Sequence, residues 1–135
     1  MKPLRWFVVL LLVTCCGCQK SAPPASSVPR FPERTFTDHW FMDPIALKHF
    51  KENANAVPMG ADIRQVILVL GVPDADLAFQ KNEYHRVFTY YVTRKLSDHP
   101  LESDKYVSFA FDRSGKLERV YSNVESIPSK NWPWP

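Results

Sequence analysis

The sequence predicts an α+β domain in which two helices pack on one face of a three-stranded antiparallel meander (ααβββ), preceded by a signal peptide and a Pro-rich linker. Apolar residues between 62 and 71 recur with the helical period, whereas those of 106–111 alternate with other residues as in a strand. A turn at 112–115 joins that strand to another. Helices followed by antiparallel strands are typical of two-layer α+β domains.

The first residues have the organisation of a secretory signal peptide. Lys2 and Arg5 are followed by an uncharged apolar run over 6–14. Nine helical residues rise about 14 Å, far less than the roughly 30 Å of a bilayer's hydrocarbon core. Residues 1–17 are therefore predicted to be a lipoprotein signal peptide, not a membrane-spanning helix.

Cys18 is the predicted site of lipid attachment. Gly17 before it resembles the small residue that precedes the lipidated cysteine in bacterial lipoboxes. Cys16 is the alternative, because Val13 stands three places before it, where lipoboxes favour Leu or Val. No cysteine follows Cys18, so the mature domain depends on its core, without disulfides. Gln19 replaces the Asp that favours inner-membrane retention. We therefore expect a lipid-anchored envelope protein in the outer membrane, facing the periplasm.

Residues 18–34 are predicted to be a lipid-anchored linker rich in Pro and Ser. Prolines interrupt any apolar periodicity and favour polyproline II, which extends about 3.1 Å per residue. The sixteen residues 19–34 could hold a domain up to roughly 50 Å from the bilayer. The domain is predicted over 35–127 and a Trp/Pro tail over 128–135.

Two helices are predicted from capping residues and apolar spacing. The first begins with Asp43 as N-cap and Pro44 at the first helical position, and ends before Pro58. Residues 39–42 before it are expected to pack as a lid on the core. The second helix begins with a capping box of Asp62 and Gln65. The buried positions are expected to be Leu47, Phe50 and Ala54 in the first helix, and Ile63, Val66, Ile67 and Leu70 in the second. Gly71 and Pro73 terminate the second helix.

Three strands are predicted over 85–93, 106–111 and 117–124. The first is rich in β-branched and aromatic residues, with Phe88, Tyr90 and Val92 on one face. The second places Val107, Phe109 and Phe111 on one side and Tyr106, Ser108 and Ala110 on the other.

The stretch Gly60-Ala61-Asp62-Ile63-Arg64-Gln65-Val66, followed by Leu70-Gly71-Val72-Pro73, resembles the SmpA/OmlA (BamE-like) family of small outer-membrane lipoproteins. Phe111 to Leu117 (FDRSGKL) is similar to the strand-turn-strand piece of that family. The resemblance covers about 57–121. Asp62 replaces the family's Ser/Thr cap, and Tyr84 stands near its frequent tryptophan.

The resemblance implies an accessory factor of outer-membrane β-barrel protein assembly. Such a factor binds lipid and an envelope protein partner, and the partner implied here is the β-barrel assembly machine. Related domains of this shape inhibit secreted enzymes. The alternative is therefore a periplasmic binding or inhibitor module with a soluble protein or ligand target. Both are binding roles without catalysis.

The residue pattern does not indicate catalysis, a cofactor or a metal. The four histidines are scattered, without an i, i+4 pair or cysteine partners. Glycine-rich phosphate loops and Gly-x-Ser-x-Gly elbows are absent from the sequence. Without Lys2 and Arg5, the excess of basic residues falls from three to about one. Nucleic acid is therefore not an expected partner.

Four aromatic residues are candidates for a partner surface: Tyr91, Tyr121, Trp132 and Trp134. Tyr91 and Tyr121 lie on the outward face of the predicted strands, together with Ser108. Tryptophan favours interfaces with proteins and membranes. The tail residues have the equal alternative of folding back over apolar surface.

The lipid anchor can be tested by fractionating tagged protein from its host. We expect Cys18→Ala to lose membrane fractionation, because the acyl chains supply the affinity, and Cys16→Ala to keep it. If membrane fractionation follows Cys16 instead, the cleavage site lies two residues earlier than predicted.

Overall fold

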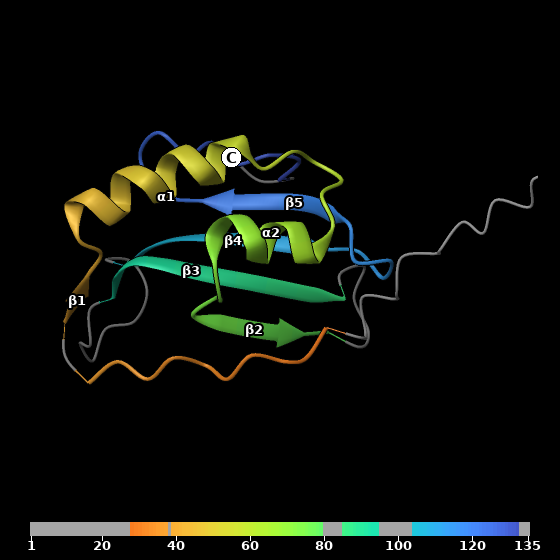
Figure 1. Ribbon diagram of the computed structural model, residues 1–135, viewed down its shortest axis with the longest axis horizontal. Coiled ribbons are helices and arrows are strands. Elements are labelled where there is room, and N and C mark those ends of the chain that lie inside the picture. The colour runs from red at the N-terminus through yellow and green to blue at the C-terminus, as the bar shows by residue number, and fades with distance from the viewer. Residues whose placement is uncertain (1–27, 38, 80–84, 95–103, 133–135) are drawn as a thin grey trace, which may run out of the picture.

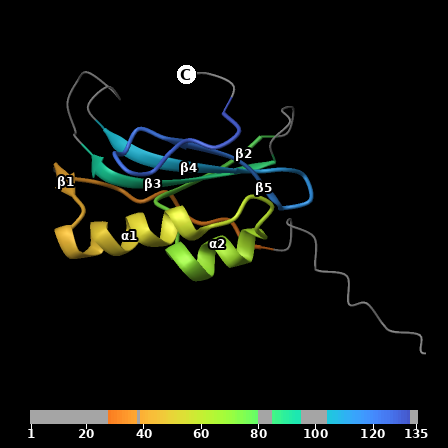
Figure 2. The same ribbon diagram turned by 90° about the horizontal axis from the view of Figure 1, so that it is seen from above.

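A computed structural model describes residues 28–37, 39–79, 85–94 and 104–132 of the chain. Helices α1 (Pro44–Ala56) and α2 (Ile63–Leu70) lie along one face of an antiparallel sheet (Figures 1 and 2). The strands are β1 (Trp40–Phe41), β2 (Ala75–Ala78), β3 (Arg86–Arg94), β4 (Lys105–Phe111) and β5 (Leu117–Ser122). The predicted α+β class, with two helices, is confirmed.

The sheet has five strands, so the prediction of three was wrong. β3, β4 and β5 form the expected meander, with Phe109 opposite both Phe88 and Val120. β1 and β2 both pair with the other side of β3, at opposite ends of that strand. These two strands are only two and four residues long, too short to show alternation. Their conformation follows from pairing with β3.

The predicted caps fix both ends of α2. The Asp62 carboxylate accepts a hydrogen bond from the Arg64 amide at 2.9 Å, and the Gln65 side chain accepts one from the Asp62 amide at 2.8 Å. Gly71 has a φ of 83° and donates its N–H to Ile67 O at 2.8 Å. Because glycine adopts positive φ without strain, the helix ends there. In α1, Asp43 accepts from the Ile45 amide at 2.9 Å, as an N-cap should.

The core lies between the helices and the inner face of the sheet. Phe88, Phe109 and Phe111 are fully buried, and the Phe88 and Phe111 rings meet edge to face at 5.0 Å. The other buried core residues from the three long strands and the two helices are Tyr90, Val92, Val107, Leu117, Val120, Phe50, Ala54, Ile63 and Val66. Leu47, Ile67 and Leu70 are partly buried against this core. The predicted inward faces therefore do meet in one core.

Residues 28–34 form an N-terminal strap that lies beside β2 (Figure 1). Val28 is buried, Phe31 packs edge to face on Phe88 at 5.9 Å, and the Arg34 amide donates to Asp74 O at 2.7 Å. The sequence assigned these residues to a free linker, because prolines hide their two apolar anchors. Their contacts instead make them part of the folded domain.

A buried ion pair holds the strap. The Asp76 and Arg86 side chains are 0% and 3% exposed, and Arg86 Nε lies 3.1 Å from Asp76 Oδ1. The Arg86 guanidinium also donates to the carbonyls of Val28 and Pro29 at 2.8 and 2.9 Å. The Phe31 amide donates to Asp76 Oδ2 at 2.8 Å. Burial by itself raises the pKa of the Asp76 carboxyl, but the hydrogen bonds from Arg86 and Phe31 and the charges of Arg86 and Arg30 outweigh it and lower this pKa.

The end of the domain also lies beyond the predicted boundary at 127. Val120 and Lys130 exchange two backbone hydrogen bonds of 2.9 Å, so residues 129–131 lie along the outer edge of β5. The Ser129 hydroxyl accepts from the Ser122 amide at 2.9 Å. Since the strap lies beside β2, segments of this chain cover part of each edge of the sheet. Such cover protects an edge from pairing with other chains.

The Asp76–Arg86 pair predicts the acid sensitivity of the fold. We expect Asp76→Asn to lower the free energy of unfolding by about 3 kcal/mol at pH 7, because it leaves the Arg86 charge buried without its counter-ion. Urea unfolding measures this loss. The matched control is Arg30→Gln, which removes a half-exposed partner of the same carboxylate and should cost less than about 1 kcal/mol.

The sign of the pH dependence follows from the lowered pKa of Asp76. Its stabilising contribution is complete above the unfolded pKa of about 3.9, and is lost as the pH falls through the lower folded-state pKa. As the pH falls from 5 through the folded-state pKa of Asp76, the free energy of unfolding should therefore decrease more in the wild type than in Asp76→Asn. Equal losses in both proteins would contradict this account.

Candidate functional site

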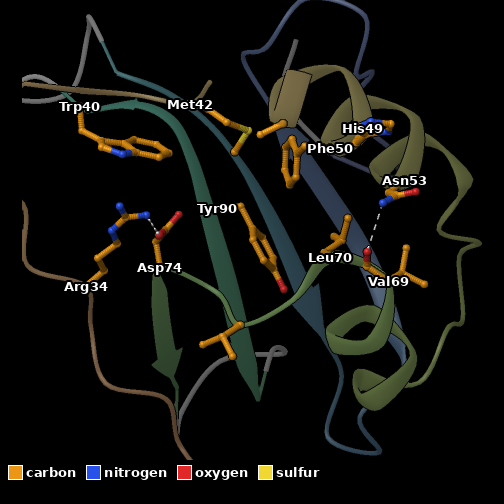
Figure 3. Close-up of a pocket in the computed structure, with 12 residues that line it drawn as sticks. Arg34, Trp40, Met42, His49, Phe50, Asn53, Val69, Leu70, Asp74 and Tyr90 are labelled. Carbon is orange, nitrogen blue, oxygen red and sulfur yellow. Dashed lines mark hydrogen bonds and ion pairs between the residues drawn. The ribbon is translucent and has the colours of Figure 1, made fainter. Parts of the chain in front are cut away.

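A hollow of about 450 Å³ opens between α1, the end of α2 and the β1 side of the sheet (Figure 3). Phe50, Leu70 and Tyr90 supply much of its apolar lining, and Met42 and Trp40 close it toward β1. Its volume lies within the range of small-ligand sites, and it also suits one or two apolar side chains of a partner.

Polar groups stand at opposite sides of this hollow (Figure 3). On one side, Arg34 Nη1 lies 3.2 Å from Asp74 Oδ1, and the same guanidinium stacks 4.5 Å from the Trp40 ring. On the other, Asn53 Nδ2 donates to Val69 O at 3.3 Å and joins the two helices. The exposed imidazole of His49 stands nearby on α1, with Nδ1 3.7 Å from the Glu52 carboxylate.

Tyr90 ties the sheet to the end of α2. Its hydroxyl donates to Gly71 O at 3.0 Å. Burial, and then the negative charges of Asp74 and Asp76, raise the pKa of Tyr90 well above its ordinary value. The hydroxyl therefore stays protonated and serves as a structural donor at neutral pH.

The outward side of α2 and the residue just beyond its Gly71 cap form an apolar patch, which we call the α2 surface: Leu68, Val69 and Val72. Leu68 is 85% exposed and Val72 62% exposed, whereas Ile63 and Val66 on the opposite side of the helix are buried. Val69 lines the first hollow and also a second one of about 250 Å³, which Leu68 and Pro58 help to form. The α2 surface therefore continues into a hollow on each side: the first has polar groups at its sides, and the second is lined mainly by apolar residues.

The outer face of the sheet, opposite the helices, has a row of aromatic rings. Tyr91 and Tyr106 lie 5.9 Å apart, Tyr106 and Tyr121 5.4 Å, and Tyr121 and Trp132 5.2 Å. The structure thus places three of the four predicted partner residues together. Trp132 folds back onto Tyr121, which was one of the two alternatives for the tail. Trp134, Cys18 and Cys16 lie outside the described residues.

Tyr106 joins Tyr91 to Tyr121 and was missed as a site residue. The signal was present, because alternation put Tyr106 on the same side of its strand as Ser108 and Ala110. The register was needed to show that it stands opposite Tyr91 and diagonal to Tyr121.

Buried charges in the described residues are engaged in ion pairs within the domain. Asp104 pairs with Arg94, as Asp76 does with Arg86. Over the described ranges, no group of three or more His, Cys, Asp or Glu side chains is placed to hold a metal ion. Neither α1 nor α2 has the length and apolarity needed to cross a membrane, and these are the helices of the described part.

The described residues form a two-layer α+β domain with an exposed apolar patch beside α2 and a row of aromatic rings on the outer sheet face. The chain matches no protein-family model and no curated protein.

The contact of Tyr90 with Gly71 predicts the local stability of the α2 end. We expect Tyr90→Phe to cost about 0.5–1.5 kcal/mol, because Gly71 O loses its donor while the ring stays packed. Amide hydrogen exchange should accelerate near Gly71. Tyr121→Phe, on the opposite face, should leave exchange there unchanged, and acceleration in both variants would refute this assignment.

Proposed function

We propose that this protein is a lipid-anchored component of the cell envelope whose single domain binds a protein partner and carries out no catalysis. Cys18 would hold it in the outer membrane, facing the periplasm. The partner we propose is the machine that assembles outer-membrane β-barrel proteins. The observation that supports this function best is the exposed apolar α2 surface.

Exposure of these side chains has a free-energy cost that a partner would remove. Burial of a Leu or Val side chain is worth about 1.5–3 kcal/mol. Contiguous exposed apolar residues on a domain are a feature of interaction sites. Leu68, Val69 and Val72 lie together beside two hollows into which a partner could insert side chains.

The α2 surface is also held rigidly, which lowers the entropy cost of binding. The capping box of Asp62 and Gln65 fixes the start of α2, and the Gly71 contact with Tyr90 fixes its end. These segments are the ones whose sequence resembles the SmpA/OmlA family. That resemblance is the reason why the β-barrel assembly machine is the partner that we propose.

The chemistry of the buried groups favours binding over catalysis. Asp76 and Asp104 are paired with arginines that tie segments of the domain together. Tyr90 is held protonated and donates to a backbone carbonyl. These polar groups therefore have structural roles that account for their burial.

An affinity pull-down from detergent-solubilised envelope tests the proposal. The wild-type protein should bring down the β-barrel assembly machine. Leu68→Ser with Val72→Ser should reduce the captured amount at least tenfold, since two apolar contacts worth over 1 kcal/mol are removed. Because both side chains are exposed, stability should change by less than about 0.5 kcal/mol.

The matched control is Ile45→Ser on α1. Ile45 is 70% exposed, apolar and away from the α2 surface. It should leave capture unchanged. An anchored protein that captures nothing from this machine would refute the assembly role and leave the inhibitor or binding-module alternative, which predicts a soluble target.

A further inference from the structure

The strap of residues 28–34 packs on the inner face of the sheet, on the same side as the helices (Figure 2). Asp76 stands opposite Phe88 in the pairing of β2 with β3, and Arg86 lies two positions before Phe88 on β3. Side chains that are directly opposite, or two positions apart, share a face of a sheet, so both charged groups lie on the face that holds the core. Phe31 packs on Phe88 at the same place. The strap therefore helps to bury the Asp76–Arg86 pair.

The strap is attached by few contacts for its length. Arg86 donates to two of its carbonyls, and Asp76 accepts from the Phe31 amide. Within the described ranges, its one backbone-to-backbone hydrogen bond joins the Arg34 amide to the carbonyl just before β2, at 2.7 Å. Val28 and Phe31 are its apolar anchors, and its two arginines add ion pairs that are half open to water. Because these contacts must offset the conformational entropy of an ordered segment, their loss costs far less than unfolding of the domain.

The Asp76–Arg86 pair does not depend on the strap. Arg86 Nε lies 3.1 Å from Asp76 Oδ1, and Arg86 Nη2 donates to the other carboxylate oxygen. The two residues belong to β2 and β3, which pair directly with each other. Release of the strap therefore exposes a pair that is still intact, and water replaces the strap as the hydrogen-bond partner of both side chains. The helices and the sheet keep their own core, in which Phe88 also contacts Phe111.

We propose that the strap is a releasable latch that sets how far the domain can stand from the membrane. The docked strap leaves the nine residues 19–27 between the domain and Cys18, and the released strap leaves the sixteen residues 19–34. At about 3.1 Å per residue, release extends the reach from about 28 Å to about 50 Å. The reach rests on the anchor of the proposed function, whereas the latch itself rests on the contacts of the strap. A partner that binds the α2 surface farther from the bilayer than the docked strap can reach releases the strap, because binding there requires the longer tether.

Native-state hydrogen exchange of the mature protein in detergent tests whether the strap is released without unfolding of the domain. The probes are the Phe31 and Arg34 amides, which are hydrogen-bonded in the docked strap, and the protected amides of β4 in the sheet. We expect the strap amides to exchange at least about a hundredfold faster than those of β4, with little dependence on urea, because release exposes little surface. Equal rates with the same urea dependence would mean that the strap opens only when the whole domain unfolds, and the proposal would be wrong.

A variant and a matched control assign this opening to the contacts of the strap. Phe31→Ala removes the ring that packs on Phe88, and it should accelerate exchange of the Arg34 amide about tenfold. Phe41→Ala removes a ring of the same kind that is 60% exposed on β1, and it should leave this exchange unchanged. Continued protection of the β4 amides shows that the sheet is folded in both variants. Unchanged exchange in Phe31→Ala, or equal acceleration by both variants, would contradict the proposal.

Energy transfer on neutral phosphatidylcholine vesicles that contain an acceptor lipid measures the reach. No cysteine follows Cys18, so Glu125→Cys at an exposed position provides a single thiol for a donor dye. In this labelled protein, Val28→Ser with Phe31→Ser removes both apolar anchors of the strap. The mean distance from donor to bilayer should then increase by about 5 to 20 Å, between the limits for a flexible and an extended tether. An unchanged distance would overturn the control of reach. A protein that does not bind the vesicles would instead refute the anchor at Cys18, and the exchange rates would still decide whether the strap is releasable.

Discussion

The whole domain depends on β3. This strand pairs with β1, β2 and β4, its inner face supplies Phe88 and Tyr90 to the core, and its outer face supplies Tyr91 to the aromatic row. Its first residue, Arg86, makes the buried ion pair that holds the strap. Strand pairing and core packing therefore meet in one nine-residue segment. A defect in β3 would therefore disturb the core and the aromatic row together.

The two surfaces differ in chemistry because they lie on different layers. The α2 surface consists of aliphatic side chains on α2 and just beyond its end, and the other side of this helix is in the core. The outer sheet face instead has half-buried rings with hydroxyl groups. The helices cover only one face of the sheet, so the two surfaces lie on different sides of the domain (Figure 2).

The strap connects the fold to the proposed anchor. Arg86 and Asp76 bind the backbone of residues 28–31, so the nine residues 19–27 remain between Cys18 and the domain. At the same 3.1 Å per residue, nine residues span about 28 Å. This reach is shorter than the roughly 50 Å expected from a linker that continued to residue 34. With the anchor proposed at Cys18, the buried ion pair would limit how far the domain stands from the membrane.

The sequence by itself determined the local structure. This comprises the N-caps of both helices, the end of α2 at Gly71, the meander and the inward residues of its strands. These features depend on neighbours within a few positions along the chain, where spacing and side-chain type are sufficient. Only the tertiary structure decided the rest. β1, β2 and the strap are too short or too proline-rich to show a pattern in the sequence. β1 and β2 form because they pair with β3, and the strap is held because its backbone hydrogen-bonds to the Asp76–Arg86 pair. The sequence indicated three of the aromatic surface residues, but the register of β3, β4 and β5 was needed to place Tyr106 between them, because such contacts join residues far apart in the chain.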